Sequence, residues 1–217
     1  MLTSLKLSLK RIALASFPRS GNTWLRFMIE EATGMRSGSV YKDRIMRRDN
    51  DGVVIKTHGL DSVSYTSAIH LLRNPFDVIE SFFYWKKNVA GDEKVCWDKH
   101  AEEAIFAWKT HTEHWLQAKY PVFRVRYEDL HTDIANKLNL LLLWLGYNVS
   151  PEKLIKVIEK AHFDKMQALN PELGDKFFRR GRVGMGQYQF TNEQKLFVID
   201  TLYDLLVLLG YKDVMEV

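Results

Sequence analysis

The chain has 217 residues, a formal net charge of +4 and a composition that is 46% hydrophobic and 27% charged. A chain of this length and balance can bury one substantial core, which is typical of an ordinary globular domain. The single cysteine, Cys96, excludes a disulfide within the chain, which favours a reducing compartment, and we expect a cytoplasmic protein.

Two classes of partner are not expected from the arrangement of the residues. The longest apolar run, residues 140–145, is far too short to cross a bilayer, so we expect no membrane span. No basic tract with interleaved aromatic side chains occurs, so nucleic acid is not an expected partner. The basic charge fits either a plain surface or a site for a polyanionic small molecule. Neither an internal repeat nor a linker divides the chain, and we expect residues 1–217 to form a single domain.

The first predicted unit is a strand, a tight loop and a helix. Residues 11–16 form an apolar run suited to a buried strand, and Pro, Ser, Gly and Asn in residues 18–22 supply turn chemistry. A helix follows to about residue 33, and Asn22 or Thr23 is its expected N-cap.

The loop of this unit predicts an anion site. It directs several backbone N–H groups and the positive end of the helix dipole at one place, which binds an anion, most naturally phosphate. Arg19 adds a forked cation that suits a phosphate or a sulfonate. The pattern is not a Walker A loop, because Gly21 is its one glycine and no lysine follows it. It is not a Gly-x-Gly-x-x-Gly dinucleotide loop either.

Residues 34–52 are polar and lack periodicity, so we expect a loop there. The next strand, residues 53–58, carries Lys56 and His58 at its end, and their two-residue spacing places both side chains on one face. Ligands of open α/β sheets bind at the carboxyl ends of the strands. Taken alone, a histidine at this position is either a functional group or a polar residue at the mouth of a loop.

A further strand, residues 68–72, runs directly into Arg73. Asn74 and Pro75 then mark the start of a helix. Ser81 lies eight residues after Arg73 on this helix, where it is either a ligand-binding hydroxyl or a plain helix-face residue.

The rest of the chain continues to alternate helices and strands. We expect helices over residues 101–119, 134–145, 151–161 and from Thr191 to about 209, and a strand over residues 122–125. Gln194 completes a capping box with Thr191. His111 and His114 lie on the first of these helices, but no Asp, Glu or Cys completes a ligand set. We therefore expect surface or interface histidines, and no metal.

Residues 17–24, Phe-Pro-Arg-Ser-Gly-Asn-Thr-Trp, resemble the 5′-phosphosulfate-binding loop of the sulfotransferases that use 3′-phosphoadenosine 5′-phosphosulfate (PAPS). Further segments match that family in the same order. They are Lys-Thr-His at residues 56–58, Arg-Asn-Pro-x-Asp-x-x-x-Ser at residues 73–81, Tyr-Glu-Asp-Leu at residues 127–130 and Phe-Arg-Arg-Gly-x-x-Gly at residues 178–184. Together these matches are far more specific than any one motif.

The resemblance implies a single α/β domain with a central parallel sheet flanked by helices and a P-loop-kinase-like strand–loop–helix phosphate site. It also implies that PAPS is the cofactor, without a metal, and that a sulfuryl group moves to a hydroxyl or amine acceptor by in-line transfer. Two alternatives stay open: a non-catalytic nucleotide-binding protein of the same fold, and a nucleotide-dependent kinase. The identity of the acceptor and the oligomeric state are not determined at this stage.

The resemblance further implies roles for individual residues. His58 would be the catalytic base, and Lys56 and Arg19 would be the cations that meet charge on the leaving group. The 5′-phosphate and the adenine would contact Arg19, Ser20, Gly21, Asn22, Thr23 and Trp24, with Tyr127 nearby. The 3′-phosphate would contact Arg73, Ser81, Arg179, Arg180 and Gly181. For Trp24, a core position in the first helix is the alternative to stacking on adenine.

The chain departs from the family pattern at two places. Arg19 stands where the cytosolic branch commonly has lysine, and an arginine can stabilise charge but cannot shuttle a proton. Met185, Gly186 and Gln187 stand where Asp-Trp-Lys is usual. We therefore expect the second half of that loop to pack differently.

Overall fold

The computed structural model describes residues 11–41, 52–169 and 181–215. Within them the strands are β1 (Ile12–Ser16), β2 (Gly38–Ser39), β3 (Ile55–Thr57), β4 (Ser67–Leu72) and β5 (Val122–Arg126). The helices are α1 (Asn22–Thr33), α2 (Pro75–Asn88), α3 (Trp97–Leu116), α4 (Tyr127–Thr132), α5 (Ile134–Trp144), α6 (Pro151–Lys160), α7 (Phe163–Leu169) and α9 (Asn192–Leu208). None of the helices in this part of the chain is long and apolar enough to cross a membrane.

The strands form one parallel sheet in the order β2-β3-β1-β4-β5, which confirms the predicted fold class. β1 is central, and its Ala15 lies opposite Thr57 of β3 and His70 of β4. Because the strands are parallel, the segments that follow Ser16, Thr57 and Leu72 leave the sheet at the same edge. In sheets of this kind that edge is where ligands bind.

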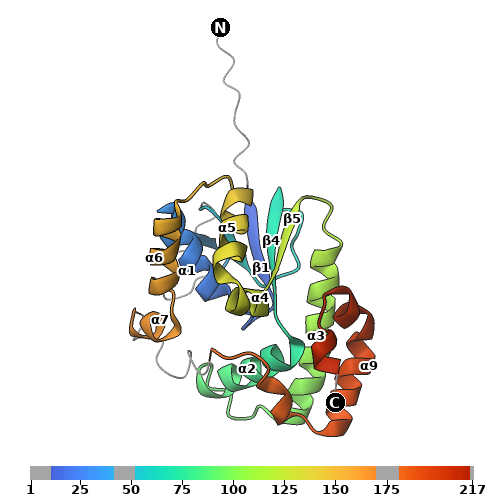
Figure 1. The fold of residues 1–217 in the computed structure, drawn as a ribbon. Helices are drawn as coiled ribbons and strands as arrows, with labels where there is room; N and C mark the ends of the chain where they lie inside the picture. The colour runs from blue at the N-terminus through green and yellow to red at the C-terminus, as the bar shows by residue number, and fades with distance from the viewer. Residues whose placement is uncertain (1–10, 42–51, 170–180, 216–217) are drawn as a thin grey trace.

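Helices cover both faces of the sheet (Figure 1). On one face Leu14 of β1 packs in a cluster with residues of α1, α5 and α6, including Leu25 and Leu141. On the other face Ala13 and Ala15 belong to a cluster with Trp115 of α3. The alternation along β1 places large residues against one helical layer and alanines beneath a tryptophan on the other. The core therefore holds β1, and with it the loop that follows, from both sides.

Three of the predicted helix starts are confirmed. The Asn74 side chain accepts the Phe76 amide at α2, and the Ser150 side chain accepts the Lys153 amide at α6. Thr191 forms the predicted capping box with Gln194 at α9.

The predicted cap of α1 is wrong. The N-cap is Gly21 with φ 94°, a left-handed conformation that favours glycine, and it makes no side-chain capping bond. The side-chain nitrogen Nδ2 of Asn22 instead donates back to the Leu14 carbonyl, 3.2 Å, and to Ser16 Oγ, 3.1 Å. Asn22 thus ties the start of α1 to β1.

The loop predicted over residues 34–52 is wrong at one place within the described residues. Gly38–Ser39 forms the edge strand β2, because the Gly38 amide donates to the Val54 carbonyl at 2.8 Å and the strand continues along β3. Two residues carry too little hydrophobic alternation to be recognised as a strand from the sequence.

His111 is not a surface histidine as predicted. Its side chain is 3% exposed, and its ring lies 5.9 Å from Phe17 and 5.9 Å from His70 of β4. α3 packs this residue onto the sheet, so the amphipathic face of the helix includes the histidine. Burial lowers the pKa of His111 to about 3, and burial followed by the nearby His111 lowers the pKa of His70 well below its ordinary value.

We expect these buried imidazoles to make the fold acid-sensitive. A histidine whose pKa is depressed in the fold contributes stability that is present above its unfolded pKa and is lost as the pH falls toward the folded pKa of about 3. When the pH falls from 7.5 to 5, we expect His111 to lower the free energy of unfolding by about 2 kcal/mol. Urea unfolding of the wild type and of His111→Phe at both pH values checks this. Equal losses in the two proteins would contradict it.

Candidate active site

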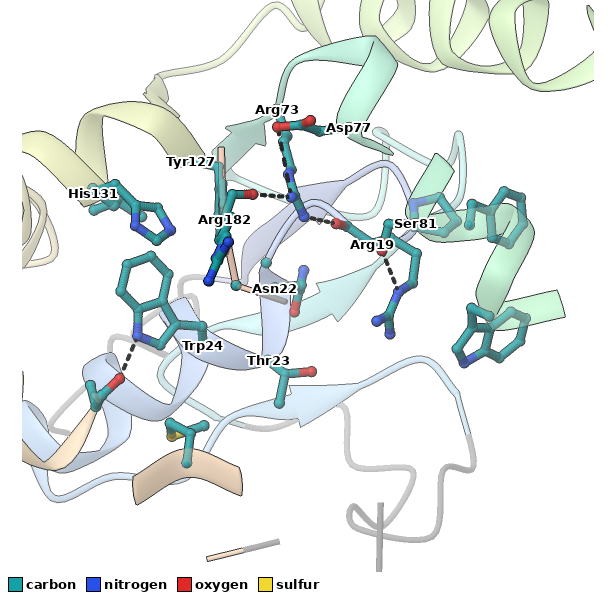
Figure 2. A pocket seen from close by; sticks show the side chains of 18 of the residues that line it. Arg19, Asn22, Thr23, Trp24, Arg73, Asp77, Ser81, Tyr127, His131 and Arg182 are labelled. Atoms are coloured by element: carbon teal, nitrogen blue, oxygen red, sulfur yellow. Dashed lines mark hydrogen bonds and ion pairs between the residues drawn. The ribbon is translucent and has the colours of Figure 1, made fainter. Parts of the chain in front are cut away.

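A cavity of about 880 Å³ opens at the carboxyl edge of the sheet. It is lined from the loop after β1, the end of β3, and helices α1, α2, α4 and α6 (Figure 2). The predicted site residues that line it are Arg19, Gly21, Asn22, Thr23, Trp24, Lys56, His58, Arg73, Ser81, Tyr127 and Gly181. Ser20 belongs to the same loop, and its side chain is buried. Arg179 and Arg180 lie outside the described residues.

The loop between β1 and α1 adopts a conformation suited to anion binding. Arg19 and Gly21 both have positive φ, 70° and 94°. A Cβ on Gly21 would lie 2.5 Å from the ring of Tyr127, so only glycine fits there. This tightly packed loop leads directly into the 12-residue helix α1, whose N-terminal residues line the cavity.

His58 is held in an orientation that suits a base. Its Nδ1 lies 2.7 Å from the Ser16 carbonyl, so Nδ1–H donates there and Nε2 carries the lone pair that can take a proton. Burial, followed by the charge of Lys56, lowers the pKa of His58 to about 4, which keeps the imidazole neutral at pH 7. The Trp115 indole donates to the carbonyl of Gly59 at 3.1 Å, which fixes the chain just beyond His58.

Tyr41 contacts both Lys56 of β3 and His58, which directly follows this strand. The Tyr41 ring stacks on the His58 ring with centroids 5.6 Å apart. Lys56 Nζ lies 5.8 Å from the centre of the Tyr41 ring. The Tyr41 hydroxyl also accepts the His58 amide at 3.0 Å. Lys56 and His58 thus share one face, as their spacing predicted. No sequence pattern indicated Tyr41, because it lies just after the two-residue edge strand β2, in a segment without periodicity.

Arg73 lies between the two predicted phosphate-binding segments. Its Nη1 donates to the Arg19 carbonyl at 3.0 Å, and its Nη2 donates to the Arg182 carbonyl at 3.1 Å. Its guanidinium carbon lies 4.2 Å from the centre of the Tyr127 ring. Ser81 accepts a hydrogen bond from Arg19 Nε at 3.3 Å. The structure therefore brings Arg19, Arg73 and Ser81 together, although their contacts with phosphate stay a prediction.

Trp24 and His131 lie at one end of the cavity, and Arg19 with Ser81 lies at the other (Figure 2). The Trp24 indole donates to the Ala161 carbonyl at 2.8 Å, and its ring lies 5.0 Å from the His131 ring and 5.5 Å from the Tyr127 ring. Trp24 is half-buried, so it both packs against the protein and lines the cavity. His131 was not predicted from the sequence, although it directly follows the Tyr-Glu-Asp-Leu segment.

The fold resembles the solved structures of a sulfotransferase and of retinol dehydratase, both in complex with PAP. The mouse sulfotransferase SULT7A1, crystallised in complex with PAP, superposes with a TM-score of 0.75 at 21% identity, over 91% of this chain and 84% of that one. Retinol dehydratase in complex with androsterone and the inactive cofactor PAP superposes with a TM-score of 0.69 at 15% identity, over 90% and 80%. At these identities the likeness concerns the fold.

Relatives are also found by sequence. A WSCD family member of Aedes aegypti is 29% identical over 165 residues, which are 65% of this chain and 52% of that protein. A WSCD family member of Drosophila pseudoobscura pseudoobscura is 38% identical over 92 residues, 29% of its length. The chain thus spans about half or less of these relatives. Rat sulfotransferase 2A2 is 22% identical over 84% of this chain and 79% of its own.

The model of the sulfotransferase domain family matches residues 51–206, which is more than half of the chain. The matched region contains β3 and β4, which His58 and Arg73 directly follow, and α2 and α4, which carry Ser81 and Tyr127. Because this family model matches more than half of the chain, and the sheet order agrees with it, the chain belongs to the sulfotransferase domain family.

Proposed function

We propose that this protein transfers a sulfuryl group from PAPS to a hydroxyl or amine acceptor. The observation that carries the proposal is His58, which is oriented by the Ser16 carbonyl and lies in the same cavity as the anion-binding loop, Arg19 and Lys56. A neutral base beside cations is what removal of an acceptor proton next to a departing anion requires. Binding of an anion alone does not require a base.

The residues of the cavity fit an adenosine bisphosphate. The loop of residues 18–23 and the helix dipole of α1 would bind the 5′-phosphate, with Arg19 beside it. Arg73 and Ser81 would face the 3′-phosphate together with Arg179, Arg180 and Gly181. Trp24 offers a ring face for the adenine. A cavity of about 880 Å³ has the size of an ordinary ligand pocket.

When bound, PAPS would supply an activated sulfuryl group whose bond to the bridging oxygen of the 5′-phosphate can break. As the acceptor oxygen or nitrogen bonds to sulfur, His58 Nε2 takes the acceptor proton. The electron pair of the broken bond stays on the 5′-phosphate, and Arg19 and Lys56 stabilise that charge. The imidazolium of His58 then releases its proton to water. These residues act mainly by positioning and charge stabilisation, as proteins do in phosphoryl transfer.

The negative charge of the bound nucleotide also affects the base. In the free protein Lys56, Arg26 and Arg19 all lower the pKa of His58. A bisphosphate beside these cations offsets their effect, so the nucleotide raises the basicity of His58. His58 therefore becomes a better base when the donor is in place.

A transfer assay tests this proposal. The protein is incubated with PAPS that carries labelled sulfur and with a panel of phenols, aliphatic alcohols, saccharides and amines. We expect label in an acceptor, together with an equal amount of the product adenosine 3′,5′-bisphosphate (PAP). Tight PAP binding without transfer to any acceptor would favour a non-catalytic nucleotide-binding protein. Consumption of ATP with Mg²⁺, and none of PAPS, would favour a kinase.

A further inference from the structure

Asp77 is a buried carboxylate in the first turn of α2 that the proposed chemistry does not use. Its side chain is 2% exposed. Its Oδ2 accepts the Gly184 amide at 2.8 Å, and its Oδ1 accepts the Gly186 amide at 2.7 Å. Arg73 Nη2 lies 3.9 Å from Oδ2. Both carboxylate oxygens are thus used to hold a segment more than 100 residues away, which is how a buried charge is kept satisfied.

Gly186 allows this segment to lie directly on α2. A Cβ at Gly186 would lie 2.3 Å from the Phe76 carbonyl oxygen and 2.6 Å from the Asp77 Cα, so any side chain would push the segment away. The family pattern has tryptophan at this position. The chain has Met185, Gly186 and Gln187 where the family usually has Asp-Trp-Lys. Gly186 makes a close backbone contact with α2 that a tryptophan at this position could not make.

Arg73 extends the same network to the other phosphate-binding segment. It donates to the carbonyl of Arg182, in the segment that Asp77 holds, and to the carbonyl of Arg19, in the loop before α1. Figure 2 shows Arg73 between these two carbonyls with Asp77 beside it. Asp77 and Arg73 thus set the distance between the segments proposed to bind the 3′- and 5′-phosphates.

We propose that Asp77 is a positioning residue for the 3′-phosphate. Asp77 also lines the cavity, but both of its oxygens are engaged by the Gly184 and Gly186 amides, so it acts through the segment that it holds. It anchors residues 182–186, and through them the preceding Gly181 at the cavity, at the separation from the β1–α1 loop that a nucleoside 3′,5′-bisphosphate spans. This inference rests on the proposed PAPS function.

Electrostatics and positioning predict opposite effects of removing this charge. A carboxylate close to an anion site repels the anion, so its neutralisation alone would raise the affinity for a bisphosphate. Loss of the anchor instead lowers that affinity. In Asp77→Asn the side-chain oxygen can accept one of the two glycine N–H groups, but the side-chain NH₂ then faces the other N–H, and two donors cannot bond to each other. The direction of the change therefore decides between the two effects.

The test compares binding of adenosine 3′,5′-bisphosphate and AMP by calorimetry in the wild type, in Asp77→Asn and in Asp200→Asn, an exposed carboxylate on α9. For Asp77→Asn we expect the bisphosphate affinity to fall by about tenfold or more and the AMP affinity to change by less than about twofold. For Asp200→Asn we expect neither to change. Unchanged or tighter bisphosphate binding, or equal losses for both ligands, would overturn the inference.

Gly186→Ala tests the anchor without altering any charge, and it also decides the matter should Asp77→Asn fail to fold. We expect the same selective loss of bisphosphate affinity. Gly59→Ala is its control, because a Cβ there meets Thr57 Oγ1 at an ordinary 3.5 Å. Equal bisphosphate affinity in Gly186→Ala and the wild type would contradict the inference. A wild type that does not prefer the bisphosphate over AMP would instead remove the proposed function.

Discussion

Replacing His58 with alanine is expected to abolish sulfuryl transfer and to leave binding of adenosine 3′,5′-bisphosphate intact. In the proposed mechanism the imidazole is the base, held through Nδ1 by the Ser16 carbonyl, and its side chain supplies none of the groups proposed to bind the two phosphates. General base catalysis contributes about 100- to 10,000-fold, and we expect kcat to fall by that factor. Steady-state kinetics and calorimetric titration of the same preparation provide the two measurements.

The pH dependence of the wild type gives a second measure of His58. A base must be neutral to act, so kcat/KM for PAPS rises with pH through the pKa of the base in the nucleotide-free enzyme. Because burial and Lys56 lower the pKa of His58 to about 4, this rise is expected well below the ordinary histidine range, with a flat profile from pH 6 to 7.5. A limb centred near pH 6.5, or transfer that survives in His58→Ala, would show that another group is the base.

Replacing Arg19 with alanine is expected to lower turnover more than nucleotide affinity. Its side chain donates to Ser81 at the end of the cavity away from Trp24, whereas its backbone carbonyl, which a substitution retains, is the group that accepts from Arg73. In the proposed mechanism this side chain stabilises the developing charge on the leaving oxygen. We expect kcat to fall by about 100-fold or more and PAP affinity by about tenfold or less.

Arg19→Lys is the matched control for this prediction. It keeps the positive charge that the cytosolic sulfotransferases place here with lysine, so it should retain much of the turnover that Arg19→Ala loses. Equal losses of kcat and of PAP affinity in Arg19→Ala would assign the side chain a binding role alone. Turnover in Arg19→Lys as low as in Arg19→Ala would mean that the forked geometry of arginine, more than its charge, is required.

Local patterns in the sequence predict most of the architecture that forms the site. The apolar runs that lead to Arg19, His58 and Arg73 contain strands β1, β3 and β4. Because parallel strands end at one edge, the residues that follow them meet. Helix starts at Asn74, Ser150 and Thr191 follow from side-chain capping chemistry that operates within three residues. Such features depend on few neighbours and can therefore be recognised in one sequence.

The features that could not be predicted depend on distant contacts. Gly21 caps α1 because the Tyr127 ring packs against it, a constraint from a segment about half the chain away. His111 is buried because β4 supplies His70 beneath α3. The bonds from Gly184 and Gly186 to Asp77 span 107 and 109 residues. In each case the residue type alone indicates a surface or a turn position, and only tertiary packing determines its place.

Calorimetric titration with adenosine 3′,5′-bisphosphate, beside AMP and ATP, tests the central claim most directly, because it asks whether the cavity recognises a 3′-phosphate. A site formed by the α1 loop, Arg73 and Ser81 is expected to bind the bisphosphate tightly and AMP weakly. Each contact with the added 3′-phosphate contributes about as much as a charge-assisted hydrogen bond. The affinity for the bisphosphate should therefore exceed that for AMP by more than about tenfold. Equal affinities for the bisphosphate and AMP would contradict the assignment of Arg73, Ser81, Arg179, Arg180 and Gly181, and with it the identification of PAPS as the donor.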